Sequence, residues 1–221
     1  MPVQSSHQVV AIDGPAASGK SSVARELARR LKFIYVNSGA MYRAVTWIVL
    51  ERGIGPDDQN GIAKFIGQAR LDANFVDGQF HLLINNADFT QHLHEERVNA
   101  EVSQVSTVPE VRRLLVQRMR DCATMHDLVI EGRDIGSVVF PDTAYKFYID
   151  ASPEVRAQRR AAEGLRDEIA QRDRADSSRA ASPLIVAKDA EIIDTSDLSI
   201  GAVVDEIVSR LTRKGLGRVA I

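Results

Sequence analysis

Short apolar runs alternate with segments of helical spacing over the first fifty residues. Residues 8–13 form an apolar run typical of a buried strand, and a glycine–proline pair ends it. From residue 20 to about residue 32, apolar side chains recur every three or four positions, which predicts a helix. Residues 33–36 predict a second strand, and residues 39–51 predict a second helix. Strand, glycine loop and helix in this order are typical of an α/β fold.

The pattern changes between about residues 71 and 93. Apolar stretches are short there, and the pairs Asp77-Gly78 and Asn85-Asn86 separate them, as in hairpin turns. We expect a small antiparallel insertion of about three strands, distinct from the parallel core. The preceding residues 54–69 are mixed, contain a Gly-Pro-Asp-Asp turn, and predict no regular element.

Strands and helices alternate again in the second half of the chain. Helical spacing covers residues 109–123, and further helices start near Ser152 and Ser199, each a suitable N-cap. Strands are predicted at residues 128–131, 144–149 and 190–193. This alternation predicts a three-layer α/β core, a parallel sheet with helices on both faces.

Composition and charge narrow the classes of function. The 221 residues suffice for one domain with a small insertion, and 28 Lys+Arg against 30 Asp+Glu give a net charge of −2. We therefore expect neither nucleic acid nor a membrane as partner, and any anion site must be a local cluster of cations. The single cysteine, Cys122, excludes an internal disulfide and fits a reducing cytoplasm. The N-terminus has no apolar leader, and we expect a cytoplasmic monomer.

A phosphate-binding loop lies between the first strand and the first helix. It matches the pattern Gly-x-x-x-x-Gly-Lys-Ser/Thr with the residues Gly14, Pro15, Ala16, Ala17, Ser18, Gly19, Lys20 and Ser21. Glycines let backbone N–H groups surround phosphates, and Lys20 can reach the β- and γ-phosphates of a nucleotide. The Ser21 hydroxyl can ligate Mg²⁺, and we expect Ser22 to contact the α-phosphate. The loop predicts ATP binding but does not identify the acceptor.

Arginine clusters favour a small kinase over other nucleotide-binding proteins. An Asn-Lys-x-Asp element for guanine and a transporter-type Leu-Ser-Gly-Gly-Gln segment are both missing from the sequence. A small kinase needs a second anion pocket and a cationic lid, because it must bring two polyanions together. Arg43 follows Ser38 by about one helical turn. Two further sets share one helix face each: Arg156, Arg159 and Arg160, then Arg172, Asp176 and Arg179.

Five sequence blocks, in order and spacing, resemble the bacterial cytidylate kinases over about residues 8–212. The blocks are the phosphate loop, residues 37–43 (Asn-Ser-Gly-Ala-Met-Tyr-Arg), residues 103–105 (Ser-Gln-Val), residues 132–141 (Gly-Arg-Asp-Ile-Gly-Ser-Val-Val-Phe-Pro) and Arg172…Asp176…Arg179. The resemblance implies Mg²⁺-dependent transfer of the γ-phosphoryl group of ATP to CMP and dCMP. It also implies a core of residues 1–53 and 107–221 with a lid at about 156–180, and a monophosphate-binding insertion at about 54–106.

The resemblance assigns roles to individual residues. It implies that Ser38, Arg43 and Arg133 hold the monophosphate, that Ser103, Arg112 and Asp134 read the cytosine, and that Arg172, Asp176 and Arg179 serve the sugar and the transferring phosphoryl group. We expect Lys20, Arg133, Arg159 and Arg179 to be the catalytic residues. An ionised Asp134 can accept a hydrogen bond from the cytosine amino group, whereas uracil would present an acceptor there.

Some positions depart from the family pattern, and some alternatives stay open. Asn37 and Glu131 stand at positions where the family usually or often has aspartate. Ala175 and Ser177 stand where the lid often carries arginines. The alternatives are a kinase for UMP, AMP or shikimate, and an ATP-binding regulatory module without turnover. Phosphorylation of nucleic-acid 5′ ends is disfavoured by the acidic balance of the chain.

Overall fold

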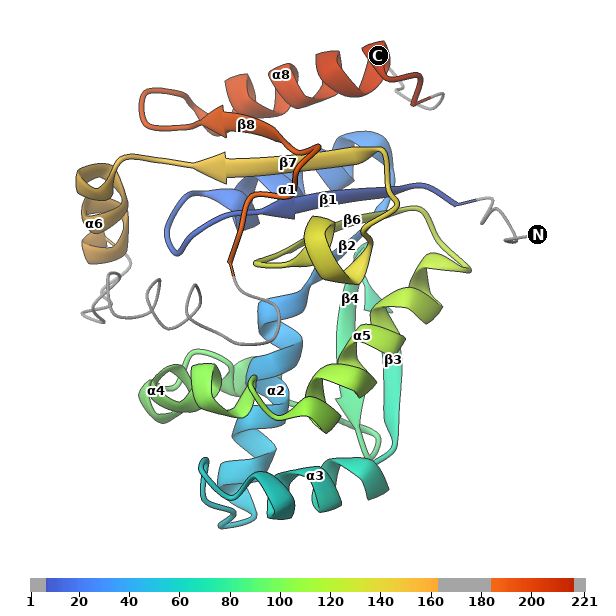
Figure 1. The fold of residues 1–221 in the computed structure, drawn as a ribbon, viewed down its shortest axis with the longest axis vertical. Helices are drawn as coiled ribbons and strands as arrows, with labels where there is room; N and C mark the ends of the chain where they lie inside the picture. The colour runs from blue at the N-terminus through green and yellow to red at the C-terminus, as the bar shows by residue number, and fades with distance from the viewer. Residues whose placement is uncertain (1–6, 163–183, 217–221) are drawn as a thin grey trace.

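The computed structural model describes residues 7–162 and 184–216. In these ranges one sheet runs through the molecule in the order β3-β4-β2-β6-β1-β7-β8, with β5 paired to β4 (Figure 1). The parallel strands are β1 (Val9–Asp13), β2 (Ile34–Asn37), β6 (Leu128–Gly132), β7 (Tyr145–Asp150) and β8 (Glu191–Asp194). The antiparallel strands are β3 (Leu71–Val76), β4 (Gln79–Ile84) and β5 (Ala87–Asp88). The predicted α/β class is confirmed, with a mixed, mostly parallel sheet.

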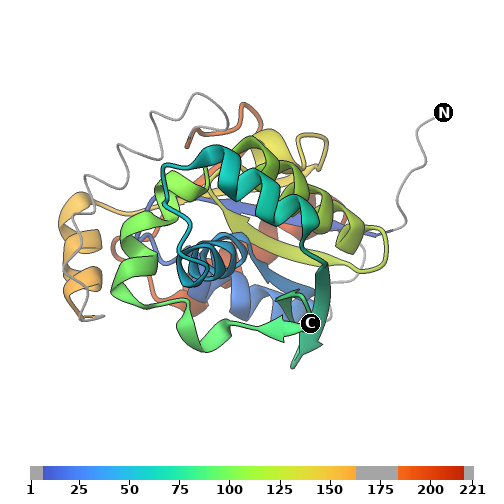
Figure 2. The ribbon, with the colours of Figure 1, turned by 90° about the horizontal axis from the view of Figure 1, so that it is seen from below.

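Helices cover both faces of the parallel strands (Figures 1 and 2). The described helices are α1 (Lys20–Leu31), α2 (Ser38–Glu51), α3 (Gln59–Gln68), α4 (Glu96–Val105), α5 (Pro109–Ala123), α6 (Pro153–Ala162) and α8 (Ile200–Arg213), with a 3₁₀ turn η1 (Thr90–His92) and a π-helical turn η2 (Ile135–Val139). Alternate residues of β1 enter different cores: Val10 and Ile12 pack with α1 and α8, whereas Val9 and Ala11 pack with α2 and α5. This period of two is what a strand buried on both faces requires.

Two helices were not predicted from the sequence. α3 lies in the segment that predicted no element, although Ile62, Phe65 and Ile66 stand at helical spacing within it. Its N-cap Asp58 accepts a hydrogen bond from the Gly61 amide at 2.8 Å, so the turn before it is the start of a helix. α4 follows the hairpin directly. Both helices pack against the core that α2 and α5 share.

The antiparallel strands are not a sheet of their own, which corrects the expectation of an insertion distinct from the parallel core. The predicted turns do form, with positive φ angles of 49° at Asp77 and 53° at Asn85. However, β4 pairs with β2 in parallel through Tyr35 and Gln79, and the Tyr35 amide donates to the Gly78 carbonyl at 2.9 Å. The hairpin therefore extends the central sheet. The division of the chain into core, insertion and lid stays a prediction.

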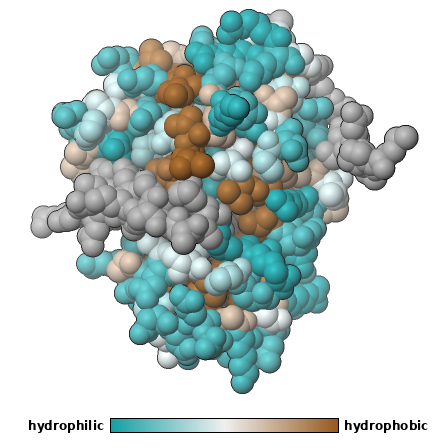
Figure 3. All heavy atoms as spheres, viewed as in Figure 1, coloured by the Kyte–Doolittle hydropathy of each residue, from teal (hydrophilic) through white to brown (hydrophobic). Residues whose placement is uncertain are grey.

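The surface facing the viewer is mostly hydrophilic, with apolar side chains gathered over β8 and the segment before it (Figure 3). Exposed apolar residues there include Ile185, Val186 and Ile192. Cys122 is buried, and burial raises the pKa of its thiol to about 11. Within the described ranges, the helices are too short or too polar to cross a bilayer.

We expect Ile66→Ala to destabilise the protein by about 3 kcal/mol, because the fully buried Ile66 side chain fills the interface of α3 with the core. Urea unfolding measures the difference. Lys64→Ala, on the exposed face of the same helix, is the matched control and should change the free energy of unfolding by less than about 0.5 kcal/mol. Equal effects of the two variants would contradict the packing of α3 described above.

Candidate functional site

The phosphate-binding loop joins β1 to α1 and depends on glycine at two positions. A Cβ at Gly14 would lie 2.1 Å from the carbonyl oxygen of Ile149, so only glycine lets the loop pass this close to the end of β7. Gly19 has a φ of 88°, in the left-handed region, where it starts α1. These contacts fix the loop at the carboxyl end of the parallel strands, where α/β proteins place their ligands.

The N-terminus of α1 is open to an anion. A capping side chain is missing, and the first turn of α1 holds no acidic residue, so its N–H groups and positive dipole end remain available. Lys20 is buried and its Nζ donates to the Pro15 carbonyl at 2.9 Å, which draws the side chain back over the loop. The Ser18 hydroxyl is buried without a hydrogen-bond partner among the described residues. The loop therefore offers backbone N–H groups, a cation and a hydroxyl to a polar ligand.

A cleft of about 540 Å³ opens from the phosphate loop. Predicted site residues that line it are Ala16, Ala17, Gly19, Lys20, Ser21, Ser22, Ser38, Arg43, Ser103, Arg112, Arg133 and Asp134. The structure therefore brings the loop and the predicted acceptor residues to one cavity, although they come from the loop after β1, from α1, α2, α4 and α5, and from the segment after β6. Arg172, Asp176 and Arg179 lie outside the described residues.

Two arginines of α6, Arg156 and Arg159, contact the phosphate loop from outside the cleft. An Arg156 Nη1 donates to the Ala16 carbonyl at 3.2 Å, and Arg159 Nη1 donates to the Ser18 carbonyl at 3.1 Å. Arg159 also donates through Nη2 to the carbonyl of Thr195 at 2.8 Å. Arg160, from the same helix, lines the cleft. The catalytic role expected of Arg159 stays a prediction, and in this structure its guanidinium braces the loop backbone.

One end of the cleft carries cations and hydroxyls beside the start of α2. The Ser38 hydroxyl donates to the Glu131 carbonyl at 2.7 Å, and a Cβ at Gly132 would lie 2.5 Å from that hydroxyl oxygen. The Arg43 Nε donates to Asn99 Oδ1 at 3.3 Å, which ties α2 to α4. Ser38, Arg43 and Arg133 line this part of the cavity together, as an anion site needs.

Another part of the cleft wall contains a buried ion pair. An Arg112 Nη2 donates to Asp134 Oδ2, and both residues are less than 9% exposed. The Arg112 guanidinium also lies 5.7 Å from the centre of the Tyr42 ring. Ser103, one turn from the end of α4, lines the same region. A fixed carboxylate next to a fixed guanidinium presents an acceptor and donors side by side, a pattern suited to the edge of a base.

Three buried carboxyl groups stand at the ends of β1 and β6 or just beyond, and each has a different partner. Asp13 accepts from the Ile135 amide at 2.8 Å and from the Gly136 amide at 2.7 Å, while Asp134 is paired with Arg112. Burial raises the pKa of Asp13 to about 6, and the two backbone hydrogen bonds only partly oppose this effect. The third carboxyl group, Glu131, accepts from the Tyr35 hydroxyl at 3.1 Å.

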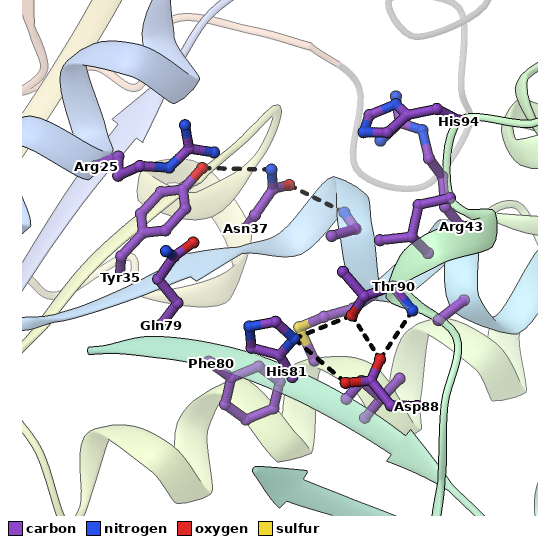
Figure 4. Close-up of a pocket in the computed structure, with 15 residues that line it drawn as sticks. Arg25, Tyr35, Asn37, Arg43, Gln79, Phe80, His81, Asp88, Thr90 and His94 are labelled. Atoms are coloured by element: carbon purple, nitrogen blue, oxygen red, sulfur yellow. Dashed lines mark hydrogen bonds and ion pairs between the residues drawn. The ribbon is translucent and has the colours of Figure 1, made fainter. Parts of the chain in front are cut away.

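Sequence reasoning missed several residues that line the cleft, among them Arg25, Tyr42, Asn99 and Ser106. A smaller cavity of about 160 Å³ adjoins it beside β4 (Figure 4). The two cavities share Arg25, Asn37, Arg43 and His94. Tyr42 lies within the sequence block at residues 37–43, whereas Asn99 belongs to α4 and Ser106 caps its C-terminal end, and this helix was not predicted from the sequence.

Comparison with known proteins gives a consistent result. The family model described as Cytidylate kinase matches residues 10–213. A cytidylate kinase of Pelotomaculum thermopropionicum is 41% identical, covering 92% of this chain and 95% of the relative. One of Oceanobacillus iheyensis is 39% identical, covering 91% and 93%. A bifunctional pantoate ligase/cytidylate kinase of Synechococcus elongatus is 42% identical over 97% of this chain, which spans only 44% of that longer protein.

The raised pKa of Asp13 predicts a pH effect on stability. On folding, Asp13 takes up a proton between about pH 4 and pH 6, so its stabilising contribution is present at low pH and lost as the pH rises through about 6. We expect the free energy of unfolding of the native protein, relative to Asp13→Asn, to fall by about 1 kcal/mol between pH 5 and pH 7.5. Urea unfolding of both proteins at the two pH values measures this. A difference that stays constant or increases would contradict the prediction.

Proposed function

The chain belongs to the cytidylate kinase family, and we propose that it transfers the γ-phosphoryl group of ATP directly to CMP and dCMP, giving ADP with CDP or dCDP. The observation that carries this proposal is a single cleft lined both by the phosphate-binding loop and by the buried Arg112–Asp134 pair. The loop suits a phosphoryl donor, and the ion pair suits a base with an amino group.

The donor nucleotide binds at the phosphate loop. Backbone N–H groups at the start of α1 and the Lys20 ammonium group neutralise the phosphates, and Ser22 contacts the α-phosphate. Mg²⁺ fits the oxygen ligands present, which are the Ser21 hydroxyl and the nearby Glu131 carboxylate. Mg²⁺ at such sites is held by one or two protein side chains and mainly by the nucleotide phosphates and water. Bound there, Mg²⁺ supplies charge neutralisation of the phosphoryl group.

The acceptor phosphate binds at the start of α2. Ser38 donates from the first helical residue, and the Arg43 and Arg133 guanidinium groups supply positive charge. The hydrogen bond from Arg43 to Asn99 holds this side chain before the acceptor arrives. A preformed anion site reduces the ordering that binding requires.

The base is read by the Arg112–Asp134 pair. Asp134 accepts from the cytosine amino group, and Arg112 and Ser103 donate to the O2 and N3 acceptors. Because Arg112 fixes Asp134 as an ionised acceptor, a uracil carbonyl in this place would face a carboxylate oxygen without a proton between them. An unpaired buried carboxylate is costly, so the pair discriminates between the two bases.

Catalysis requires no protein nucleophile. The donor and acceptor phosphates lie in one cleft, and the transfer is accelerated by alignment and by neutralisation of the developing charge. Lys20, Arg133, Arg159 and Arg179 are proposed for this role, and Arg172, Asp176 and Arg179 for the sugar and the phosphoryl group. We further propose a cytoplasmic monomer that acts on nucleotides and not on nucleic acid, in line with the net charge of −2.

The function is tested by ADP release from Mg-ATP with CMP, dCMP, UMP, AMP, shikimate or no acceptor. We expect rapid release with CMP and dCMP and little with the others, because among these acceptors only cytosine combines an amino group for Asp134 with the N3 and O2 acceptors for Ser103 and Arg112 on one edge. Equal release with and without acceptors, or none with any of them, would reject the proposal and favour a nucleotide-binding module without transfer.

The base reader is tested by Asp134→Ala. We expect the ratio of kcat/KM for CMP to that for UMP to fall by about 100-fold, equivalent to the loss of one charged hydrogen bond. Binding of ADP in the absence of acceptor should be unchanged, which controls for the integrity of the phosphate loop. Unaltered selectivity in a folded variant would assign base recognition to other residues.

A further inference from the structure

A buried chain of hydrogen bonds connects the start of α2 to the carboxylate of Glu131. Asn37 Nδ2 donates to the Tyr35 hydroxyl at 3.3 Å, and this hydroxyl donates to Glu131 Oε1 at 3.1 Å. Tyr35 and Glu131 are each 3% exposed, and Asn37 and Glu131 both line the cleft (Figure 4 shows Tyr35 and Asn37). Asn37 and Glu131 also face each other in the register of β2 and β6. The three side chains form one local unit.

The fold determines the direction of each hydrogen bond between Asn37, Tyr35 and Glu131. Asn37 is the N-cap of α2, and its Oδ1 accepts from the Ala40 amide at 2.9 Å. Its Nδ2 must therefore face Tyr35, whose oxygen acts as the acceptor. The hydroxyl proton of Tyr35 is then directed at Glu131, because a carboxylate has no proton to donate and acts only as an acceptor.

The residue types at both ends suit this direction. An aspartate at position 37 would present only acceptor oxygens, and it would compete with Glu131 for the single proton of Tyr35. The asparagine supplies a donor instead, without adding negative charge beside the Glu131 carboxylate. Asn37 and Glu131, the two departures from the family pattern in this region, are thus linked through one tyrosine hydroxyl.

Glu131 differs in its partners from the other two buried carboxyl groups near the cleft. Asp13 is held by two backbone amides, and Asp134 by the Arg112 guanidinium. Glu131 is held at one oxygen by a neutral phenol, which orients a carboxylate without cancelling its charge. In the sheet, Glu131 pairs with Ile12 of β1, and it lines the cleft beside the phosphate loop. It is therefore available for the cation that accompanies the donor phosphates.

We propose that Tyr35, aligned by Asn37, is a positioning residue that holds the Glu131 carboxylate in the orientation that favours binding of the metal-bound donor nucleotide over the metal-free nucleotide. This inference rests on the proposed phosphoryl transfer from Mg-ATP. It does not depend on the identity of the acceptor, so the two can fail separately.

The test measures ADP binding by calorimetry, once with Mg²⁺ and once with EDTA, in the absence of any acceptor. The ratio of the two dissociation constants gives the metal preference. We expect Tyr35→Phe to lower this preference by about 10-fold, as found for residues that orient metal-binding groups, and to leave the affinity for CMP unchanged. Glu131→Gln should lower it at least as far.

A second variant separates positioning from simple packing. Asn37→Ser keeps a capping hydroxyl for α2 but removes the amide donor to Tyr35. We expect it to lower the metal preference by about threefold, the effect of one neutral hydrogen bond. In the background of Tyr35→Phe it should have no further effect on the metal preference, because Asn37 acts through the tyrosine hydroxyl.

Asp58→Ser is the matched control, since Asp58 is the N-cap of α3 in the same way but contacts neither Tyr35 nor Glu131. It should leave the metal preference unchanged. Unfolding midpoints of all variants show any general loss of stability. The proposal is overturned by an unchanged metal preference in Tyr35→Phe or, if that variant does not fold, in Asn37→Ser. If the losses of metal preference from Asn37→Ser and Tyr35→Phe were equal and added up in the double variant, Asn37 would not act through Tyr35, and the proposed order of the three residues would be wrong.

Discussion

The close approach of backbone segments at the carboxyl edge of the sheet is the constraint on which the rest of the structure depends. Gly14 passes the end of β7 at a distance that no side chain allows, and Gly132 does the same against the Ser38 hydroxyl. These two contacts bring the phosphate loop and the start of α2 to the ends of neighbouring strands. The cleft is the space that remains between them, and its polar groups are therefore fixed by backbone packing.

The same packing explains how the protein keeps three carboxyl groups buried within a small region. Each would be costly alone, and like charges in proximity would add to that cost. Backbone amides, a phenol and a guanidinium group satisfy Asp13, Glu131 and Asp134, respectively. These partners leave three groups of different chemistry in or near the cleft: a carboxyl group that titrates near pH 6, a carboxylate beside the phosphate loop, and the acceptor that we propose reads the base.

Much of this architecture was predictable because it rests on local signals. The glycine loop, the alternation of strands and helices and the N-cap at Ser199 each involve neighbouring residues, and the structure has them where the sequence placed them. The helix α3 was missed because its apolar residues are few and its start resembles a turn. The pairing of β4 with β2 was missed because it joins residues over forty positions apart, for which the sequence carries no local signal. Asn99 was missed as a cleft residue because the helix that carries it, α4, was not predicted.

The anchoring of the Asp77-Gly78 turn has a consequence for engineering. An exposed two-residue hairpin turn is ordinarily a permissive place to insert an epitope or a fluorescent reporter. Here the carbonyl of Gly78 accepts from the backbone of Tyr35, whose side chain contacts Glu131 at the cleft. A label inserted at this turn would pull on the strand beneath the nucleotide site. The turn at Asn85-Asn86, which bonds to the neighbouring Arg70 segment, is the safer place for such a graft.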